Sequence, residues 1–594
     1  MRRLHHRLIL GCGTGLALVC AAQIQTPTAS APAQSATANP ASAAAAAERA
    51  AMAAFGRGDS SWATPGGDAQ RSSWVRTDAK ISKEGVQKPD FKFLWKLKLT
   101  DSTARTNSLT PAVLLNRYIG YRGFRDLAFV ENDGRDIYGI DIDLGRIEWN
   151  VPDNNARAAS SCGTESAAGV ARSVVAAFPS PSRGFGFGRG GPAHSGVGQP
   201  DGGAVTLAEA GQYGVRPTPA PATTPTANAA RPATTPPPPV PPAAASPSGA
   251  PVPPSRGDAN APGVPGSGGP APRPPRSPIV IQVLTADGLL HTMYVSNGQE
   301  PKPPVSFIPA NMRARGFIVV NDVAYAAATA CNGAASSIVS LDLKSGATGK
   351  WDAPSGIAGL DGPAFGPDGT LFVSTTGGEL LALDGKTLEV KDSFKSAEPF
   401  VSSPVIFQYR TRVLGVAATK SGSLVLFDTK SLGGDDHLTP LSKTKPQAGQ
   451  SLPSTAVASW MDTGARRWIL ATAKSSGKGA IAAWQVKEQN GGLVLELGWT
   501  SREIPSPSAP MIINGVVFAA SNAEPGESLR SRRAPSVIYA LDGVTGSELW
   551  NSGKAIASSA HNGSLSGGES QIYLGADDGN LYAFGAWIER QVSP

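Results

Sequence analysis

The stretch that decides the fold is GPAFGPDGTLFVSTTGGELLALDGKTLEVKDSF, residues 362–394. It contains four short runs rich in apolar and β-branched residues, GPAF, TLFVSTT, ELLALD and LEVKDSF, which are separated by Pro-Asp-Gly, Gly-Gly and Gly-Lys turns. Glycine supplies the positive φ angles that tight hairpins need, so each of these turns can reverse the chain. The stretch therefore predicts a meander of four antiparallel strands.

Similar units recur along the chain. The clearest lie at 127–151, 316–354 and 509–550, and weaker ones lie at 412–428 and 467–499. Antiparallel four-strand units that repeat about every 40–50 residues are typical of a β-propeller. The third strand of each unit is apolar on both faces, as in VIYAL, LLAL and IVSL. A ring of stacked blades buries both faces of that strand. In a sheet with one face in water, apolar and polar residues would instead alternate along the strand. The sequence therefore predicts an all-β propeller.

The blade number follows from the length of the repeat region. Residues 91–585, without a low-complexity insertion at 179–277, leave enough chain for eight blades of about 50 residues each. The region ends with QIYLGA and NLYAFG (571–585), and no fourth strand follows them. The first run, FKFLWKLKL (91–99), carries a tryptophan where fourth strands carry theirs. We expect Phe91–Leu99 to complete the last blade and close the ring, because this pairs an otherwise bare strand edge.

The N-terminus predicts export. Residues 1–22 combine a basic start, an apolar run and small residues before Gln23, which is typical of a secretory signal. A membrane-spanning helix is the alternative, but the apolar run is short and contains three glycines. Cys20 also suggests a lipid anchor, although Val19 is bulkier than such a processing site favours.

Four other segments lie outside the repeats. Residues 23–58 and 179–277 are low-complexity sequence rich in Ala, Pro and other small residues, which we interpret as a flexible tether and a disordered insertion within the propeller. Residues 59–90 form a lead-in to the first strand, and residues 586–594 form a C-terminal tail.

Charge and cysteine content exclude some partners and suggest a compartment. The net charge of +7 includes three arginines of the signal. The remaining positive charge is too dilute for a nucleic-acid-binding surface, which needs clustered basic residues. No other apolar run is long enough to span a bilayer, so we expect an exported protein that is periplasmic, outer-membrane-associated or secreted. Outside the signal only Cys162 and Cys331 remain, and in an oxidising compartment they suggest one disulfide between adjacent blades.

Several units carry a common pattern, [IV]-Y-A-L-D-x-x-T-G-x-x-L-W, which is clearest at residues 538–550. This pattern resembles the repeat of pyrroloquinoline-quinone (PQQ) type, or quinoprotein-like, propellers. The lead-in SWATPGGDAQRSSWVRTDAKIS (61–82) is similar to that family's Trp-Gly-Gly-Asp-Arg entry. Units 2 and 5 depart most from the pattern: Phe307 stands near the tryptophan position of unit 2, and unit 5 has no tryptophan. The matching runs are IYGIDIDLGRIEW (137–149), IVSLDLKSGATGKW (338–351), LLALDGKTLEV (380–390), IYALDGVTGSELW (538–550) and LYAF (581–584).

The resemblance also assigns structural roles to residues that recur once per blade. It implies that the outer-strand tryptophans dock neighbouring blades, where large aromatic surfaces stabilise stacking. The recurring aspartates stand where a strand meets a turn, and we expect them to accept turn N–H groups rather than to bind metal. The tryptophans are Trp95, Trp149, Trp351, Trp499 and Trp550, and the aspartates are Asp141, Asp342, Asp384, Asp428 and Asp542.

The family resemblance implies two different functions. One branch comprises PQQ-dependent alcohol dehydrogenases, with the quinone between a tryptophan and an adjacent Cys-Cys disulfide, a calcium ion and an aspartate base. The other comprises non-catalytic BamB-like outer-membrane assembly propellers. This sequence has no adjacent cysteines and no Cys-x-x-Cys-His haem site.

Histidine offers no clear substitute for the missing cysteine pair. A glucose dehydrogenase branch uses histidine, and His561 in SSAHNGSL could face the channel, but a polar loop role fits it better. The other histidines after the signal are His194, in the insertion, His291, and His437, in an Asp-rich loop, and no pair has metal-ligand spacing.

We therefore expect no catalytic residue, no bound metal and no cofactor, and we predict a non-catalytic scaffold that binds proteins of the bacterial cell envelope, in outer-membrane protein assembly for example. The alternative is a PQQ- and calcium-dependent alcohol or sugar dehydrogenase with an atypical site. A third hypothesis is a carbohydrate- or wall-binding module, and no motif in the sequence distinguishes it from the other two.

Overall fold

The described part of the protein covers most of the expected repeat region. The predicted signal, tether and insertion lie outside it and stay predictions. No helix in the described residues is long and apolar enough to cross a membrane. The computed structural model describes residues 62–100, 109–120, 123–132, 136–152, 169–178, 278–309, 311–333, 335–446, 456–475, 478–522, 535–560 and 565–587.

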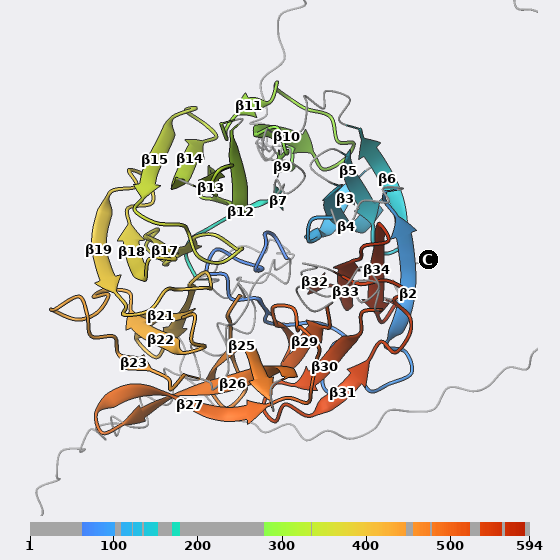
Figure 1. Cartoon of the computed structure of the whole chain (residues 1–594). Helices are drawn as coiled ribbons and strands as arrows, with labels where there is room; N and C mark the ends of the chain where they lie inside the picture. The colour runs from blue at the N-terminus through green and yellow to red at the C-terminus, as the bar shows by residue number, and fades with distance from the viewer. Residues whose placement is uncertain are drawn as a thin grey trace, which may run out of the picture. The chain divides into compact units, whose positions relative to one another are not determined.

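Within these ranges the chain forms strands and turns and no helix. The strands make eight antiparallel sheets of at least four strands, and these sheets stand as blades around a ring (Figure 1). The innermost strands of blades 2 and 3 contact each other, as do those of successive blades from 4 to 8, and β3 of blade 1 contacts β32 of blade 8. The prediction of an all-β, eight-bladed propeller is confirmed.

The first four blades take their strands in chain order. Blade 1 has β3 (Val113–Gly120), β4 (Gly123–Asn132), β5 (Asp136–Asp141) and β6 (Arg146–Val151). Blade 2 has β7 (Gly169–Ala171), β9 (Val280–Leu284), β10 (Leu289–Tyr294) and β11 (Val305–Ser306). Blade 3 has β12 (Met312–Val320), β13 (Val323–Ala330), β14 (Ser336–Asp342) and β15 (Thr348–Ala353). Blade 4 has β16 (Ala364–Phe365), β17 (Leu371–Ser374), β18 (Glu379–Leu383) and β19 (Val390–Lys395).

The last four blades follow the same plan until the ring closes. Blade 5 has β20 (Val405–Tyr409), β21 (Arg412–Ala418), β22 (Leu424–Asp428) and β23 (Ser442–Lys443). Blade 6 has β24 (Ala458–Met461), β25 (Arg467–Ser475), β26 (Lys478–Gln489) and β27 (Gly492–Thr500). Blade 7 has β28 (Met511–Ile513), β29 (Val516–Ala520), β30 (Ile538–Asp542) and β31 (Glu548–Asn551). Blade 8 has β32 (Ser566–Gly568), β33 (Gln571–Gly575), β34 (Asn580–Gly585) and β2 (Lys92–Lys98).

The meander at 362–394 forms blade 4 as predicted. Leu371 pairs with Leu383 across the hairpin of β17 and β18. Gly378 in the intervening turn has φ +87°, a conformation that favours glycine. Four of the five residues of β18 are buried, so both faces of this third strand are covered by neighbouring blades.

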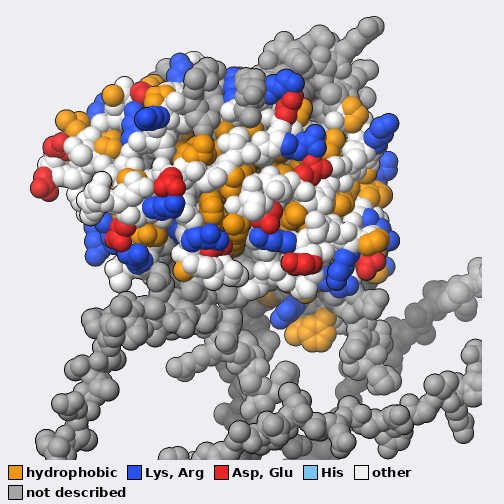
Figure 2. All heavy atoms as spheres, turned by 90° about the horizontal axis from the view of Figure 1, so that it is seen from below, with side chains coloured by type: hydrophobic (Ala, Val, Ile, Leu, Met, Phe, Trp, Pro, Cys, Tyr) orange, Lys and Arg blue, Asp and Glu red, His pale blue; other side chains and the backbone are white. Residues whose placement is uncertain are grey.

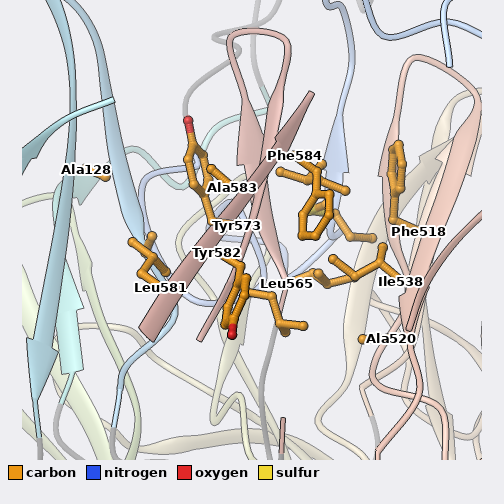
Figure 3. Close-up of a cluster of buried hydrophobic side chains, with 14 of the residues drawn as sticks. Ala128, Phe518, Ala520, Ile538, Leu565, Tyr573, Leu581, Tyr582, Ala583 and Phe584 are labelled. Atoms are coloured by element: carbon orange, nitrogen blue, oxygen red, sulfur yellow. The ribbon is translucent and has the colours of Figure 1, made fainter. Parts of the chain in front are cut away.

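The N-terminal strand closes the ring, as predicted. β2 pairs antiparallel with β34, with Phe93 opposite Phe584 and Leu97 opposite Leu581. The hydrophobic cluster at this closure joins blades 7, 8 and 1, and in Figure 3 Phe584 of β34 lies on the side of its blade that faces Phe518 of β29. The closure therefore uses both strand pairing and a shared apolar core.

Two blades differ from the simple four-strand plan. Short parallel strands extend their inner edges: β1 (Trp74–Val75) pairs with β28, and β8 (Ser173–Val174) pairs with β12. The units that depart most from the repeat pattern, 2 and 5, have fourth strands of only two residues, β11 and β23.

Candidate functional site

The lead-in runs along the inner side of the ring, and in Figure 1 its blue trace crosses the centre of the blades. Its backbone carbonyls accept hydrogen bonds from the inner strands of five blades and from Arg172, between β7 and β8. A segment that bonds to so many inner strands fixes them relative to one another. The bonds are Leu114 N to Trp62 O (2.7 Å), Arg172 N to Ala63 O (2.8 Å), Phe365 N to Ala69 O (2.9 Å), Ile406 N to Gln70 O (3.0 Å), Ser459 N to Ser72 O (3.0 Å) and Ile512 N to Ser73 O (2.8 Å).

Arg71 is the most buried charged side chain of the lead-in, with 2% of its surface exposed. Its Nε donates to the carbonyl of Pro363 (3.0 Å), before blade 4, and its Nη2 donates to Gly316 O (2.9 Å) in blade 3. Burial lowers the pKa of Arg71 to about 10, and the charges of Asp361 and Asp68 oppose that shift. Arg71 is therefore a charged link between the lead-in and two blades.

Two of the sequence-predicted tryptophans donate hydrogen bonds across blade boundaries. Trp499 Nε1 in β27 of blade 6 donates to Gly543 O in blade 7, at 3.1 Å. Trp149 Nε1 in β6 of blade 1 donates to Val295 O in blade 2, at 3.0 Å. In both pairs the indole spans from an outer strand to a turn of the next blade.

The other three tryptophans also lie at or beside blade boundaries. The ring of Trp95 in blade 8 covers Gly145 of blade 1 so closely that a Cβ there would lie 2.5 Å from it. Trp550 of blade 7 meets the Phe91 ring edge-on, with centroids 4.9 Å apart. Trp351 of blade 3 packs against a hydrophobic cluster shared with blade 4.

The repeated aspartates serve the turns, as predicted. Each accepts at least one backbone N–H from the turn that follows it: Asp141 from Leu144, Asp342 from Lys344 and Ser345, Asp384 from Lys386 and Thr387, Asp428 from Lys430, and Asp542 from Val544 and Thr545. Asp542 also pairs with Lys83 of the lead-in at 2.9 Å.

The described histidines form local pairs with carboxylates. His291 Nδ1 lies 2.5 Å from Glu300 Oε1, and His437 Nδ1 lies 3.0 Å from Asp392 Oδ1. His194 and His561 lie outside the described residues. The structure therefore places neither His291 nor His437 in a ligand group of the kind a metal needs.

Cys331 follows β13 in the loop between the second and third strands of blade 3, where the sequence analysis expects it. It is disulfide-bonded. Cys162 and Cys20 lie outside the described residues, so the Cys162–Cys331 pairing and the lipid anchor stay predictions.

The sequence and the structure resemble those of known proteins. Residues 334–584 match the model of a family described as outer membrane protein assembly factor BamB. Within the ring, the matched residues run from the third strand of blade 3 to the third strand of blade 8, so this part of the propeller resembles PQQ-type repeats. No curated protein matches the sequence.

Solved structures of quinohemoprotein alcohol dehydrogenases share the PQQ-repeat fold. The enzyme from Comamonas testosteroni aligns with a TM-score of 0.52 at 12% identity, over 93% of this chain and 85% of that chain. ADHIIG from Pseudomonas putida HK5 aligns with a TM-score of 0.50 at 10% identity, over 92% and 83%. BamB from Moraxella catarrhalis aligns over 53% of this chain and 81% of its own, with a TM-score of 0.35 at 16% identity. The likeness to the two alcohol dehydrogenases, at such identity, shows fold and not activity.

Among the described residues, the side chains do not supply the acidic ligand group that a dehydrogenase-like calcium site implies. Hard cations such as calcium require several oxygen ligands. In the described ranges no group of three or more His, Cys, Asp or Glu side chains could hold a metal ion. The sequence also has no adjacent cysteines for the disulfide on which the quinone stacks.

Sequence reasoning missed the path of the lead-in and the arginines it brings to the inner strands. The QRSSWVR run (70–76) contains Arg71 and Arg76 beside Trp74, and it has no periodic apolar pattern. The only signal was the resemblance of this segment to the family's entry motif.

Proposed function

We propose that this PQQ-repeat propeller is a non-catalytic scaffold that binds proteins of the bacterial cell envelope, in the periplasm or at the outer membrane, as a component of outer-membrane protein assembly. The observation that carries the proposal is the chemistry of the outermost strands. The match of residues 334–584 to the BamB family model supports the same assignment.

Apolar side chains are exposed on the outermost strands of five blades, among them blades 1, 4 and 6. Ile147 on β6, Val390 on β19 and Leu497 on β27 are 40%, 50% and 52% exposed. In the described sheets each of these strands pairs with one neighbour, so its second edge is open. An open edge with exposed apolar side chains can accept an extended segment of a partner as an added strand.

The surface around these strands combines charged and apolar side chains, as a protein-binding surface does. Figure 2, which views the ring from the side of blades 5 to 7, shows basic and acidic side chains interspersed with apolar ones. Interfaces between proteins combine apolar contact with a polar surround in this way.

The contacts of the inner strands also support a scaffold function. The lead-in already pairs with the inner strands of five blades, and Arg71 binds carbonyls of blades 3 and 4. These groups hold the ring together from the inside, and the outermost strands remain available to partners.

Export is supported by the signal-like N-terminus and by cysteine chemistry. Disulfides persist in oxidising compartments such as the bacterial periplasm. Because Cys331 is disulfide-bonded, the described chain is consistent with folding outside the cytoplasm.

The test is a capture experiment with matched variants. The full chain is immobilised and exposed to detergent-solubilised envelope extract, and bound proteins are identified by mass spectrometry. The triple variant Ile147→Lys, Val390→Lys, Leu497→Lys should lose a partner that the wild type retains, because lysine on an edge strand disfavours strand addition.

A second triple variant controls for charge. Val175, Leu360 and Leu438 are 65%, 48% and 60% exposed and lie outside the outermost strands. Their replacement by lysine should leave capture unchanged. Equal capture by both triple variants, or no partner at all, contradicts the scaffold, as does dye-linked alcohol or sugar oxidation after addition of PQQ and Ca²⁺.

A further inference from the structure

Arg467 is a buried cation at the junction of blades 5 and 6 with the lead-in. It opens β25, and only 3% of its surface is exposed. Its Nη2 donates to Gln408 O at 2.8 Å, and its Nη1 donates to Ser459 Oγ at 3.4 Å. Its Nε has no hydrogen-bond partner in the described structure.

The guanidinium of Arg467 lies between two aromatic rings. Its central carbon is 5.7 Å from the ring centroid of Trp74, in the lead-in, and 5.5 Å from that of Phe407, in blade 5. Such contacts stabilise a cation only modestly. They therefore hold the side chain in place without neutralising it.

A small cavity adjoins this side chain. It leaves about 10 Å³ for the centre of a water-sized sphere, which is enough for one water molecule or one ion of similar size. Besides Arg467 and Phe407, its walls include Gln70, Ser72, Trp74 and Arg76.

The charge around the cavity is positive. Burial, and to a smaller extent the neighbouring charge of Arg76, lower the pKa of Arg467 to about 9. The charge of Asp68 acts to raise the pKa of Arg76, but no carboxylate acts on Arg467 in that direction. Arg467 thus remains protonated at neutral pH. A buried charge without a countercharge is unfavourable, and a neutral water in the cavity does not supply one.

We propose that this cavity binds one monatomic halide ion, which accepts a hydrogen bond from Arg467 Nε and supplies the countercharge that Arg467 lacks. The halide ties Trp74 and Arg76 of the lead-in to blades 5 and 6. This site is distinct from the outer strands that carry the proposed scaffold function. Either proposal can therefore be refuted without the other.

The first test is the thermal unfolding of the full chain at constant ionic strength, with chloride replaced by gluconate, which is too large for the cavity. Chloride and bromide should raise the Tm in a saturable way, by about 2–3 °C when the halide is at 100 times its Kd. An equal Tm in chloride and gluconate overturns the proposal and leaves water as the occupant.

The variant Arg467→Met keeps most of the side-chain length and removes the charge. It should abolish the difference between chloride and gluconate. The matched control Arg502→Met changes an exposed arginine that pairs with Glu548, and it should keep that difference. A halide response that persists in Arg467→Met places the ion elsewhere and overturns the proposal.

Crystals grown in bromide give a readout that needs no variant, which matters if Arg467→Met does not fold. The expected result is an anomalous peak within about 3.5 Å of Arg467 Nε, the range of a hydrogen bond to a large acceptor. Peaks only at surface arginines contradict the assignment.

Discussion

Replacement of Trp499 by alanine should weaken the boundary between blades 6 and 7. The indole is 7% exposed and donates to Gly543 O at 3.1 Å. It also covers Gly546, where a Cβ would lie 2.4 Å from the ring. The glycine turn of blade 7 and the tryptophan of blade 6 are therefore complementary in shape.

The magnitude follows from burial and from the lost hydrogen bond. Removal of a buried tryptophan side chain costs about 3–5 kcal/mol of unfolding free energy, because a cavity remains. Trp499→Phe retains most of the apolar surface but leaves Gly543 O without this donor, so it should cost about 1–2 kcal/mol. For a ring of this length the alanine variant should lower the Tm by about 3–6 °C.

Urea denaturation followed by circular dichroism gives the change in unfolding free energy, and calorimetry gives the Tm. Trp587→Ala is the matched control, since Trp587 is 42% exposed, and it should change stability by less than about 0.5 kcal/mol. If Trp499→Ala and Trp587→Ala have equal effects, the docking role of the blade tryptophans is refuted.

Three further predictions concern closure, turns and the disulfide. Deletion of Phe91–Leu99 should remove the cooperative melting transition, because it exposes the edge of β34. It also removes three buried apolar side chains, each of which stabilises the fold by about 1.5–3 kcal/mol. An unchanged calorimetric transition would contradict ring closure by this strand. The backbone N–H groups of Thr387 and Lys386, together with Lys391, lower the pKa of Asp384 to about 2. The stabilising effect of the ionised Asp384 is therefore complete above about pH 4 and is lost as pH falls toward 2. The Tm difference between wild type and Asp384→Asn should therefore shrink over that range, and a constant difference would refute the turn role. Cys162 and Cys331 should be linked in one peptide pair by mass spectrometry of the unreduced digest, and free Cys162 thiol would exclude the pairing.

The blades could be predicted from sequence because their information is local. In blade 4 each hairpin has its own glycine turn, such as Gly378, and the third strand β18 is apolar throughout. Closure was also predictable, because the unpaired β34 needed a partner and Phe91–Leu99 had the composition of a fourth strand. Both inferences depend on what a single strand requires from its neighbours.

The lead-in was not predictable, because its contacts are formed with residues far along the chain. Arg71 binds the carbonyl of Pro363, 292 residues away, and the segment's own sequence does not indicate which carbonyls it will meet. The fifth strands β1 and β8 were missed for the same reason, since a two-residue parallel pair leaves no periodic pattern in sequence.

The lead-in changes how this ring should unfold. In a repeat protein each unit contacts only its neighbours, so stability is approximately a sum of local terms and the ends can unfold separately. Here residues 62–75 bond to the inner strands of blades 1 and 4 to 7, and β2 then completes blade 8. Loss of this one segment would weaken blades that do not touch each other. The ring therefore gains contacts across its diameter, and we infer that it unfolds as one cooperative unit rather than blade by blade.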